Sequence, residues 1–127
     1  DTDNVTSFID WMPTLCAIAG IKEVPEQLDG EDISDIWLGA DRARSKPLYW
    51  RTSSTGATPA MREGKWKLHL GSRKGNEIEL YDLSVDEAES RNVADEHPHV
   101  AARMTAKLKA WVAELPDEYE KAKGKRK

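Results

Sequence analysis

The sequence predicts an α+β fold, in which a four-stranded antiparallel sheet is covered by a C-terminal helix and preceded by two short helices. Four short runs rich in strand-forming residues follow one another with short polar links, at residues 48–51, 58–62, 65–70 and 78–83. Near the C-terminus, a stripe of apolar side chains recurs at steps of three and four residues: Val100, Met104, Leu108, Trp111 and Leu115. Consecutive strands with short links indicate an antiparallel meander, and the stripe gives the helix one face to pack on it.

The first forty residues are predicted to hold the two short helices. Apolar side chains in residues 5–21 recur at helical spacing, and Gly20 is typical of a helix end. A second helix is predicted over residues 32–38, where Gly39 would end it. Residues 40–46 are rich in charge, and we expect them to form a connector to the sheet.

The third run gives the clearest strand. Trp66, Leu68 and Leu70 alternate with the polar side chains of Lys65, Lys67 and His69. Because side chains alternate between the two faces of a strand, one face is apolar and the other is polar and cationic. We expect the C-terminal helix to cover the apolar face, so that Trp66, Leu68 and Trp111 form the core.

Composition divides the chain into three predicted parts. A helical segment spans residues 1–45, the sheet and its helix span residues 46–116, and a basic tail spans residues 117–127. Five of the 19 Lys and Arg residues lie among the last seven positions, and we expect such a terminal basic run to be disordered. The chain begins with Asp1 rather than Met, so we expect a piece of a longer protein or a processed product.

Charge and hydropathy exclude several classes of protein. The net charge is −4 and the mean hydropathy is −0.70, and no run approaches the ~20 apolar residues of a membrane-spanning helix. Outside the tail, acidic side chains outnumber basic ones, which argues against binding to nucleic acid. The single cysteine, Cys16, rules out an internal disulfide and a multi-cysteine zinc site. His97 and His99 diverge around Pro98, so no metal site is predicted.

Carboxylates occur mostly in runs, such as the one containing Glu31, that we interpret as solvated loops or helix starts. Asp82 ends the fourth strand and precedes Ser84, which favours a turn-fixing role over catalysis. Asp86, Glu89 and Asn92 are interpreted as loop scaffolding, because they lack the alternating oxygens of a calcium loop. No catalytic residue is predicted in this chain.

The candidate binding residues are cationic. His69 lies on the polar face of the third strand beside Lys67, and Arg73 lies in the loop that follows. Arg51 ends the first strand. Together His69, Arg51 and Arg73 could form a rim for an anionic substrate; the alternative is an ordinary solvated sheet face.

Several short segments of the chain carry a recognisable pattern in their order and spacing. Residues 9–15 read I-D-W-M-P-T-L, residues 19–21 read A-G-I, and residues 29–33 read D-G-E-D-I. Residues 60–68 read A-M-R-E-G-K-W-K-L, and residues 79–84 read E-L-Y-D-L-S. Together these segments resemble the C-terminal region of type I, formylglycine-dependent sulfatases of the alkaline-phosphatase-like superfamily, of the arylsulfatase or N-acetylgalactosamine-6-sulfatase type.

The resemblance implies a subdomain of a parent that hydrolyses sulfate esters of aryl compounds or sugars. It implies calcium and formylglycine in an N-terminal catalytic domain, and no cofactor in this chain. The family's nucleophile motif is C/S-x-P-x-R, whereas Cys16 is followed by Ala17 and Ile18, so the chain alone is expected to be inactive. A periplasmic, secreted or lysosomal parent would fit the family.

The resemblance also implies partners: the parent's catalytic domain, and a sulfated small molecule or glycan. Apolar residues of the first forty positions would rest on that domain, and without it we expect them to fold back or to form a homodimer. Two alternatives stay open. One is a non-catalytic module that binds sulfated glycans, and the other is the same subdomain of a phosphonate or phosphate monoester hydrolase.

Overall fold

The computed structural model describes residues 4–22, 28–51, 58–71 and 77–115, so Arg73 and the basic tail at 117–127 lie outside the described residues. The chain divides into two compact units, Asp1–Pro47 and Leu48–Lys127, which we call unit 1 and unit 2. Among the described residues, no helix is both long enough and apolar enough to cross a bilayer.

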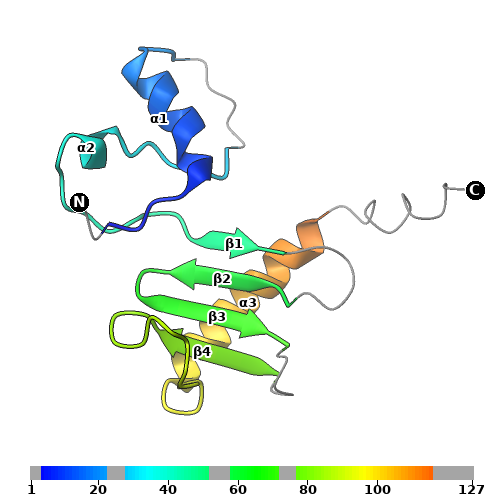
Figure 1. Ribbon diagram of the computed structural model, residues 1–127. Coiled ribbons are helices and arrows are strands. Elements are labelled where there is room, and N and C mark those ends of the chain that lie inside the picture. Colours follow the sequence, from blue (N-terminus) through cyan, green and yellow to red (C-terminus); the bar gives the residue numbers. More distant parts are fainter. Residues whose placement is uncertain (1–3, 23–27, 52–57, 72–76, 116–127) are drawn as a thin grey trace, which may run out of the picture. The chain divides into compact units, whose positions relative to one another are not determined.

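Unit 2 is an antiparallel meander with one helix (Figure 1). Strands β1 (Leu48–Trp50), β2 (Ala60–Glu63), β3 (Trp66–Leu70) and β4 (Ile78–Asp82) lie in the order β1-β2-β3-β4. Each neighbouring pair is antiparallel. The predicted fold class is therefore confirmed. Strand β3 begins one residue later than predicted, because Gly64, at a φ of +58°, and Lys65 form the turn that joins it to β2.

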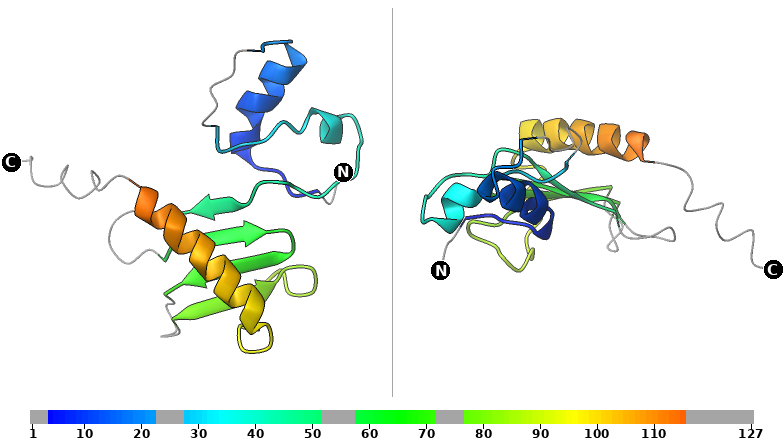
Figure 2. Two further views of the ribbon diagram at one scale, coloured as in Figure 1. Left: turned by 180° about the vertical axis from the view of Figure 1, so that it is seen from behind. Right: turned by 90° about the horizontal axis from the view of Figure 1, so that it is seen from above.

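Helix α3 (Pro98–Glu114) crosses one face of the sheet (Figure 2). Pro98 occupies its first turn, where the absent N–H costs no hydrogen bond. The strand register places one row of side chains under the helix, and this row runs through Tyr49, Met61, Leu68 and Leu80. The predicted helix-on-sheet packing is thus present.

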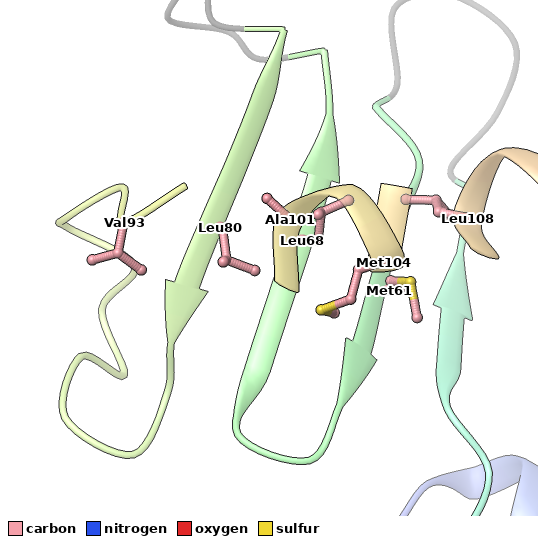
Figure 3. Close-up of a cluster of buried hydrophobic side chains, with 7 residues drawn as sticks. All are labelled: Met61, Leu68, Leu80, Val93, Ala101, Met104 and Leu108. Carbon is pink, nitrogen blue, oxygen red and sulfur yellow. The ribbon is translucent and has the colours of Figure 1, made fainter. Parts of the chain in front are cut away.

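The core of unit 2 lies between α3 and the sheet (Figure 3). Seven buried side chains form it: Met61, Leu68, Leu80, Val93, Ala101, Met104 and Leu108. Of the three predicted core residues, Leu68 is fully buried, while Trp66 and Trp111 are half-buried at the rim of this cluster. Each indole packs on a neighbouring ring instead, Trp111 on Tyr49 at 5.1 Å between centroids and Trp66 on His97 at 4.8 Å.

Unit 1 contains a 3-10 turn, η1 (Phe8–Asp10), and helices α1 (Trp11–Ile18) and α2 (Ser34–Trp37). Both helices are shorter than predicted. Gly20 has a φ of +70°, and the N–H of Ile21 donates to the carbonyl of Cys16 at 2.9 Å, which closes a Schellman motif after α1. Gly39, with a φ of +100°, ends α2 in a similar way.

Unit 1 is held together by buried polar side chains. Asp10 is 0% exposed, and Arg44, 3% exposed, binds both of its carboxylate oxygens. The Glu31 carboxylate accepts hydrogen bonds from Arg42 at 3.0 Å and from the N–H of Lys46 at 2.8 Å. The interpretation of Glu31 as a solvated carboxylate is therefore wrong, and residues 40–46 fold onto unit 1 rather than acting only as a connector.

Candidate functional site

The sheet has a second face opposite α3, which we call the open face because α3 does not cover it, and the predicted binding residue His69 lies on this face. The register places Trp50, Ala60, His69 and Glu79 in one row across the four strands. Lys67 shares this face because it lies two positions from His69 on β3. The predicted polar face of β3 is therefore confirmed.

Glu89 contacts both polar side chains of β3. Its carboxylate forms an ion pair with the Lys67 ammonium, and its Oε2 lies 3.0 Å from Nε2 of His69. Burial disfavours the charged form of Glu89, but the hydrogen bonds from Lys67 and His69 outweigh this effect and lower its pKa. The open face therefore carries a compensated cluster of charges rather than an unpaired cationic patch.

Tyr81 and Glu79 complete the cluster from β4. The Tyr81 ring meets the His69 ring edge-on at 6.0 Å, although Tyr81 is only 4% exposed. Burial, followed by the nearby charge of Glu79, raises the pKa of Tyr81 to about 12, so its hydroxyl stays protonated at neutral pH. Glu79 is buried and pairs with His69 in the strand register.

The structure describes two of the three predicted binding residues, His69 and Arg51, and does not bring these two together. Arg51 follows β1, is exposed, and lies two strands from β3, a spacing of roughly 10 Å. Arg73 is outside the described residues. Contact of His69, Arg51 or Arg73 with a substrate therefore stays a prediction.

The turns beside the cluster have the scaffolding roles that the sequence indicates. The Asp82 carboxylate accepts hydrogen bonds from the N–H of Ser84 at 3.1 Å and from its hydroxyl at 2.5 Å. Oδ1 of Asn92 accepts from the N–H of Leu80 at 3.0 Å, which satisfies part of the outer edge of β4. The turn role of Asp82 and the scaffolding role of Asn92 are confirmed.

Within 4–22, 28–51, 58–71 and 77–115, no group of three or more His, Cys, Asp or Glu side chains could hold a metal ion. Cys16 is a half-buried free thiol on α1.

Comparisons with known proteins point to one group of enzymes. The chain is similar to Arylsulfatase K of Mus musculus, with 27% identity over 121 residues, covering 86% of this chain and 22% of that protein. Delta 4,5-hexuronate-2-O-sulfatase of Bacteroides thetaiotaomicron is 28% identical over 122 residues, covering 91% of this chain and 25% of that protein. No family model matches the chain.

Solved structures share the fold. Ps i-CgsB in complex with k-i-k-neocarrahexaose matches with a TM-score of 0.68 and 23% identity, covering 80% of this chain and 23% of that one. In sequence and in fold, the chain is similar to a sulfatase C-terminal region. It spans about a quarter of the length of the curated relatives that it matches.

The same fold occurs in a phosphonate monoester hydrolase. The enzyme of Agrobacterium radiobacter matches with a TM-score of 0.50 and 24% identity, covering 87% of this chain and 25% of that one. At this identity the likeness concerns the fold alone. The fold of the chain is therefore common to both kinds of ester hydrolase.

Sequence reasoning overlooked the pairing role of Glu89. Two basic positions on one half-buried strand face need a nearby acidic side chain, because an unpaired charge is costly to bury. Lys67 and His69 gave that signal. The sequence did not show which acidic residue pairs with them, because Glu89 lies after β4, 20 positions from His69 and among other acidic residues.

Proposed function

We propose that the chain is the non-catalytic C-terminal subdomain of a sulfuric ester hydrolase. The observation that carries this proposal is the similarity to sulfatases over 86% and 91% of the chain, together with the shared fold. The relatives are an arylsulfatase and a hexuronate-2-O-sulfatase. The proposed substrates of the parent are accordingly aryl sulfates or sulfated sugars.

The chemistry of sulfate ester hydrolysis indicates which groups the parent's catalytic domain must supply and which this chain could supply. The reaction needs a nucleophile, a divalent cation to polarise the sulfate, and donors for the developing charge. Cys16 lacks the C/S-x-P-x-R context of the family's nucleophile. We assign the formylglycine and the calcium ion to the parent's catalytic domain, and assign no reaction step to residues of this chain.

The substrate would meet this subdomain only at the edge of the catalytic site. His69, Arg51 and Arg73 are the proposed contacts, since a cation next to a sulfate group favours its binding. In the structure, Nε2 of His69 already contacts Glu89. Binding through His69 therefore requires the sulfate group to replace that carboxylate.

The proposed partner is the parent's catalytic domain, and unit 1 offers the surface for it. Nine large apolar side chains are exposed there, and we call them the unit 1 apolar surface: Phe8, Ile9, Trp11, Met12, Leu15, Ile18, Ile21, Trp37 and Leu38. Phe8 is 80% exposed and Leu38 is 89% exposed. Two apolar residues of the first forty positions, Ile33 and Ile36, do not lack cover, because they are buried within unit 1.

The size of this surface supports a large partner. Trp11 contacts both Phe8 and Trp37, with ring centroids 5.3 Å and 6.1 Å apart, so the aromatic side chains form one continuous cluster. Burying apolar area contributes about 25 cal/mol per Å², so covering this cluster would stabilise a complex by several kcal/mol. About three quarters of the length of the sulfatase relatives is outside the match and could supply the cover.

A turnover assay tests the catalytic part of the proposal. We expect the purified chain to release no product from a chromogenic aryl sulfate, with or without calcium, because it lacks the nucleophile motif. Turnover above background that is lost in His69→Ala would overturn the proposal. A His99→Ala variant is the matched control, since His99 is exposed at the start of α3.

A binding assay separates the proposal from the alternative of a free-standing glycan-binding module. Calorimetry with a sulfated oligosaccharide should show no saturable binding by the isolated chain, because Glu89 occupies the His69 site. A free-standing module would instead bind the oligosaccharide in a salt-sensitive way, and His69→Ala would weaken that binding.

A further inference from the structure

Residues 83–92 return across the open face of the sheet after β4, and we call them the 83–92 segment (Figure 2, where α3 lies on the other side). Both ends of this segment are fastened to the sheet. The N–H of Leu83 donates to the carbonyl of Lys65 at 2.8 Å, and Asn92 accepts from the N–H of Leu80 at 3.0 Å. Val93 then enters the core. These end contacts do not hold the part of the segment around Glu89 against the sheet, so that part requires contacts of its own.

Glu89 lies in the middle of the segment and has an unusual backbone conformation. Its φ of +53° is left-handed, and among the described residues it is the one non-glycine residue with a positive φ. A side chain at Cβ disfavours this conformation, so it persists only where other contacts over-determine it. The left-handed conformation of Glu89 therefore depends on the contacts that surround it.

Asp86 prepares the turn that carries Glu89. Its carboxylate accepts hydrogen bonds from the N–H of Ser90 at 2.9 Å and from the N–H of Arg91 at 2.9 Å. These bonds close the loop on either side of Glu89 without touching the sheet. The Glu89 carboxylate joins the middle of the segment to β3, through Lys67 and His69.

We propose that Glu89 is a charge-dependent latch, which holds the middle of the 83–92 segment closed over Tyr81 and the Lys67–His69 pair. Neutralising its carboxylate releases this middle part, while both ends of the segment and the sheet stay folded. Because Glu89 occupies Nε2 of His69, an external anion reaches His69 only when the latch is open. This device is independent of the sulfatase assignment, since it depends only on contacts within unit 2.

The charged groups around Glu89 determine the direction of its pH dependence. Lys67 and His69 contact Glu89 from β3. Tyr81 and Glu79 of β4, and Arg62 of β2, lie on the same face of the sheet as Lys67 and His69. Asp86 belongs to the 83–92 segment, as Glu89 does. The net effect lowers the pKa of Glu89 below its ordinary value of 4.5. The latch is therefore closed at neutral pH and opens as the pH falls through this lowered pKa.

Hydrogen exchange tests the latch on the whole chain. In Glu89→Gln we expect amides of residues 84–91 to lose protection by about tenfold or more at neutral pH, because a hydrogen-bonded ion pair is lost. Amides of β2 and β3 should keep their protection. Glu87→Gln is the matched control, because it removes an exposed charge from the same segment and should change nothing.

Two further variants make the outcome decisive. Lys67→Gln should lower the protection of the same amides, because it removes the partner of Glu89 on β3. Glu89→Gly should also lower their protection, although it relieves the strain of the left-handed backbone conformation. The proposal is overturned if Glu89→Gly protects the segment as well as the native chain does, because backbone geometry would then hold it. Loss of amide protection throughout the sheet in Glu89→Gln would also overturn the proposal, since the contacts of Glu89 would then stabilise the whole sheet and not the segment alone.

Discussion

The stability of unit 1 depends on a few buried polar residues, and substituting any of them is expected to be costly. The Asp10–Arg44 ion pair is almost fully buried, and removing one partner of such a pair leaves an uncompensated buried charge. Burial opposes the charge on Asp10, but its hydrogen bonds from Arg44 and from the backbone lower its pKa. Thr14 adds a second link, since its hydroxyl accepts a hydrogen bond from the N–H of Ile33 at 3.0 Å. These contacts join α1 to the segment before α2.

Gly30 allows this junction to close, and its substitution gives the first prediction at this scale. A Cβ atom at position 30 would lie 2.1 Å from the carbonyl oxygen of Ile9, which is backbone and cannot swing away. We expect Gly30→Ala to destabilise unit 1 by about 1–3 kcal/mol or more, because overpacking forces backbone shifts. Hydrogen exchange of residues 10–18 measures this loss directly.

Asp29→Ala is the control for Gly30→Ala, because Asp29 is exposed and adjacent. It should leave exchange in α1 unchanged. Equal protection of α1 in the native chain and in Gly30→Ala would show that the close approach of Gly30 to Ile9 is not needed.

Residue-level pairings were the least predictable part of the sequence. Side-chain periodicity identified Leu68 as buried and His69 as facing away from the core, because alternation along a strand is local information. The Asp10–Arg44 pair joins positions 34 apart, and Glu89 reaches His69 over 20 positions. Such pairs depend on how the chain folds back, which no local pattern encodes.

At the element scale, α3 and the sheet support each other. The buried side of α3 presents Ala101, Met104 and Leu108 to the row of strand side chains beneath it. In the middle of α3, Arg103 and Lys107 both pair with Glu63, at the end of β2. Exposed ion pairs contribute little to stability, so the apolar row provides most of the attachment.

Trp111 tests this packing. Its indole stacks on Tyr49 with an interplanar angle of 12°, which ties α3 to the edge strand β1. Because Trp111 is half-buried rather than fully buried, we expect Trp111→Ala to cost about 1–3 kcal/mol, less than the ~3–5 kcal/mol of a buried tryptophan. The urea midpoint of unfolding measures the change.

Trp111→Phe should recover part of the loss, because a phenyl ring can still stack on Tyr49. Lys109→Ala, on the exposed side of the same helix, should have almost no effect. A midpoint that Trp111→Ala barely moves would show that the contact with β1 does not hold the helix.

The sequence predicted which elements form better than it predicted where each element begins and ends. The meander and the long helix followed from alternation and from the helical stripe, which are strong signals over many residues. A helix was predicted over residues 5–21, whereas α1 spans only Trp11–Ile18. The capping interaction between the N–H of Ser7 and the Asp10 carboxylate, at 2.8 Å, starts the helical turns later than hydrophobic periodicity indicated.

At the scale of the whole molecule, the unit 1 apolar surface has consequences for the isolated chain. Apolar side chains that lack cover favour association. We predict that light scattering will show a mass that rises with concentration, most simply toward a symmetric dimer. Leu38→Glu should weaken this association, whereas Val85→Glu should not, because Val85 is equally exposed but belongs to unit 2.

A strict monomer at all concentrations would contradict this expectation. If residues 5–38 of that monomer also exchanged their amide hydrogens as slowly as the sheet, unit 1 would be stable without a partner. The predicted boundary near residue 45 would then need revision.

The central claim is that this chain is the non-catalytic C-terminal subdomain of a sulfatase, and the reading frame upstream of the Asp1 codon tests it most directly. Sequencing that frame should reveal a C/S-x-P-x-R motif, together with the aspartates that bind calcium, encoded in phase with this chain. A frame that opens with Met shortly before Asp1 and encodes no such motif would contradict the claim.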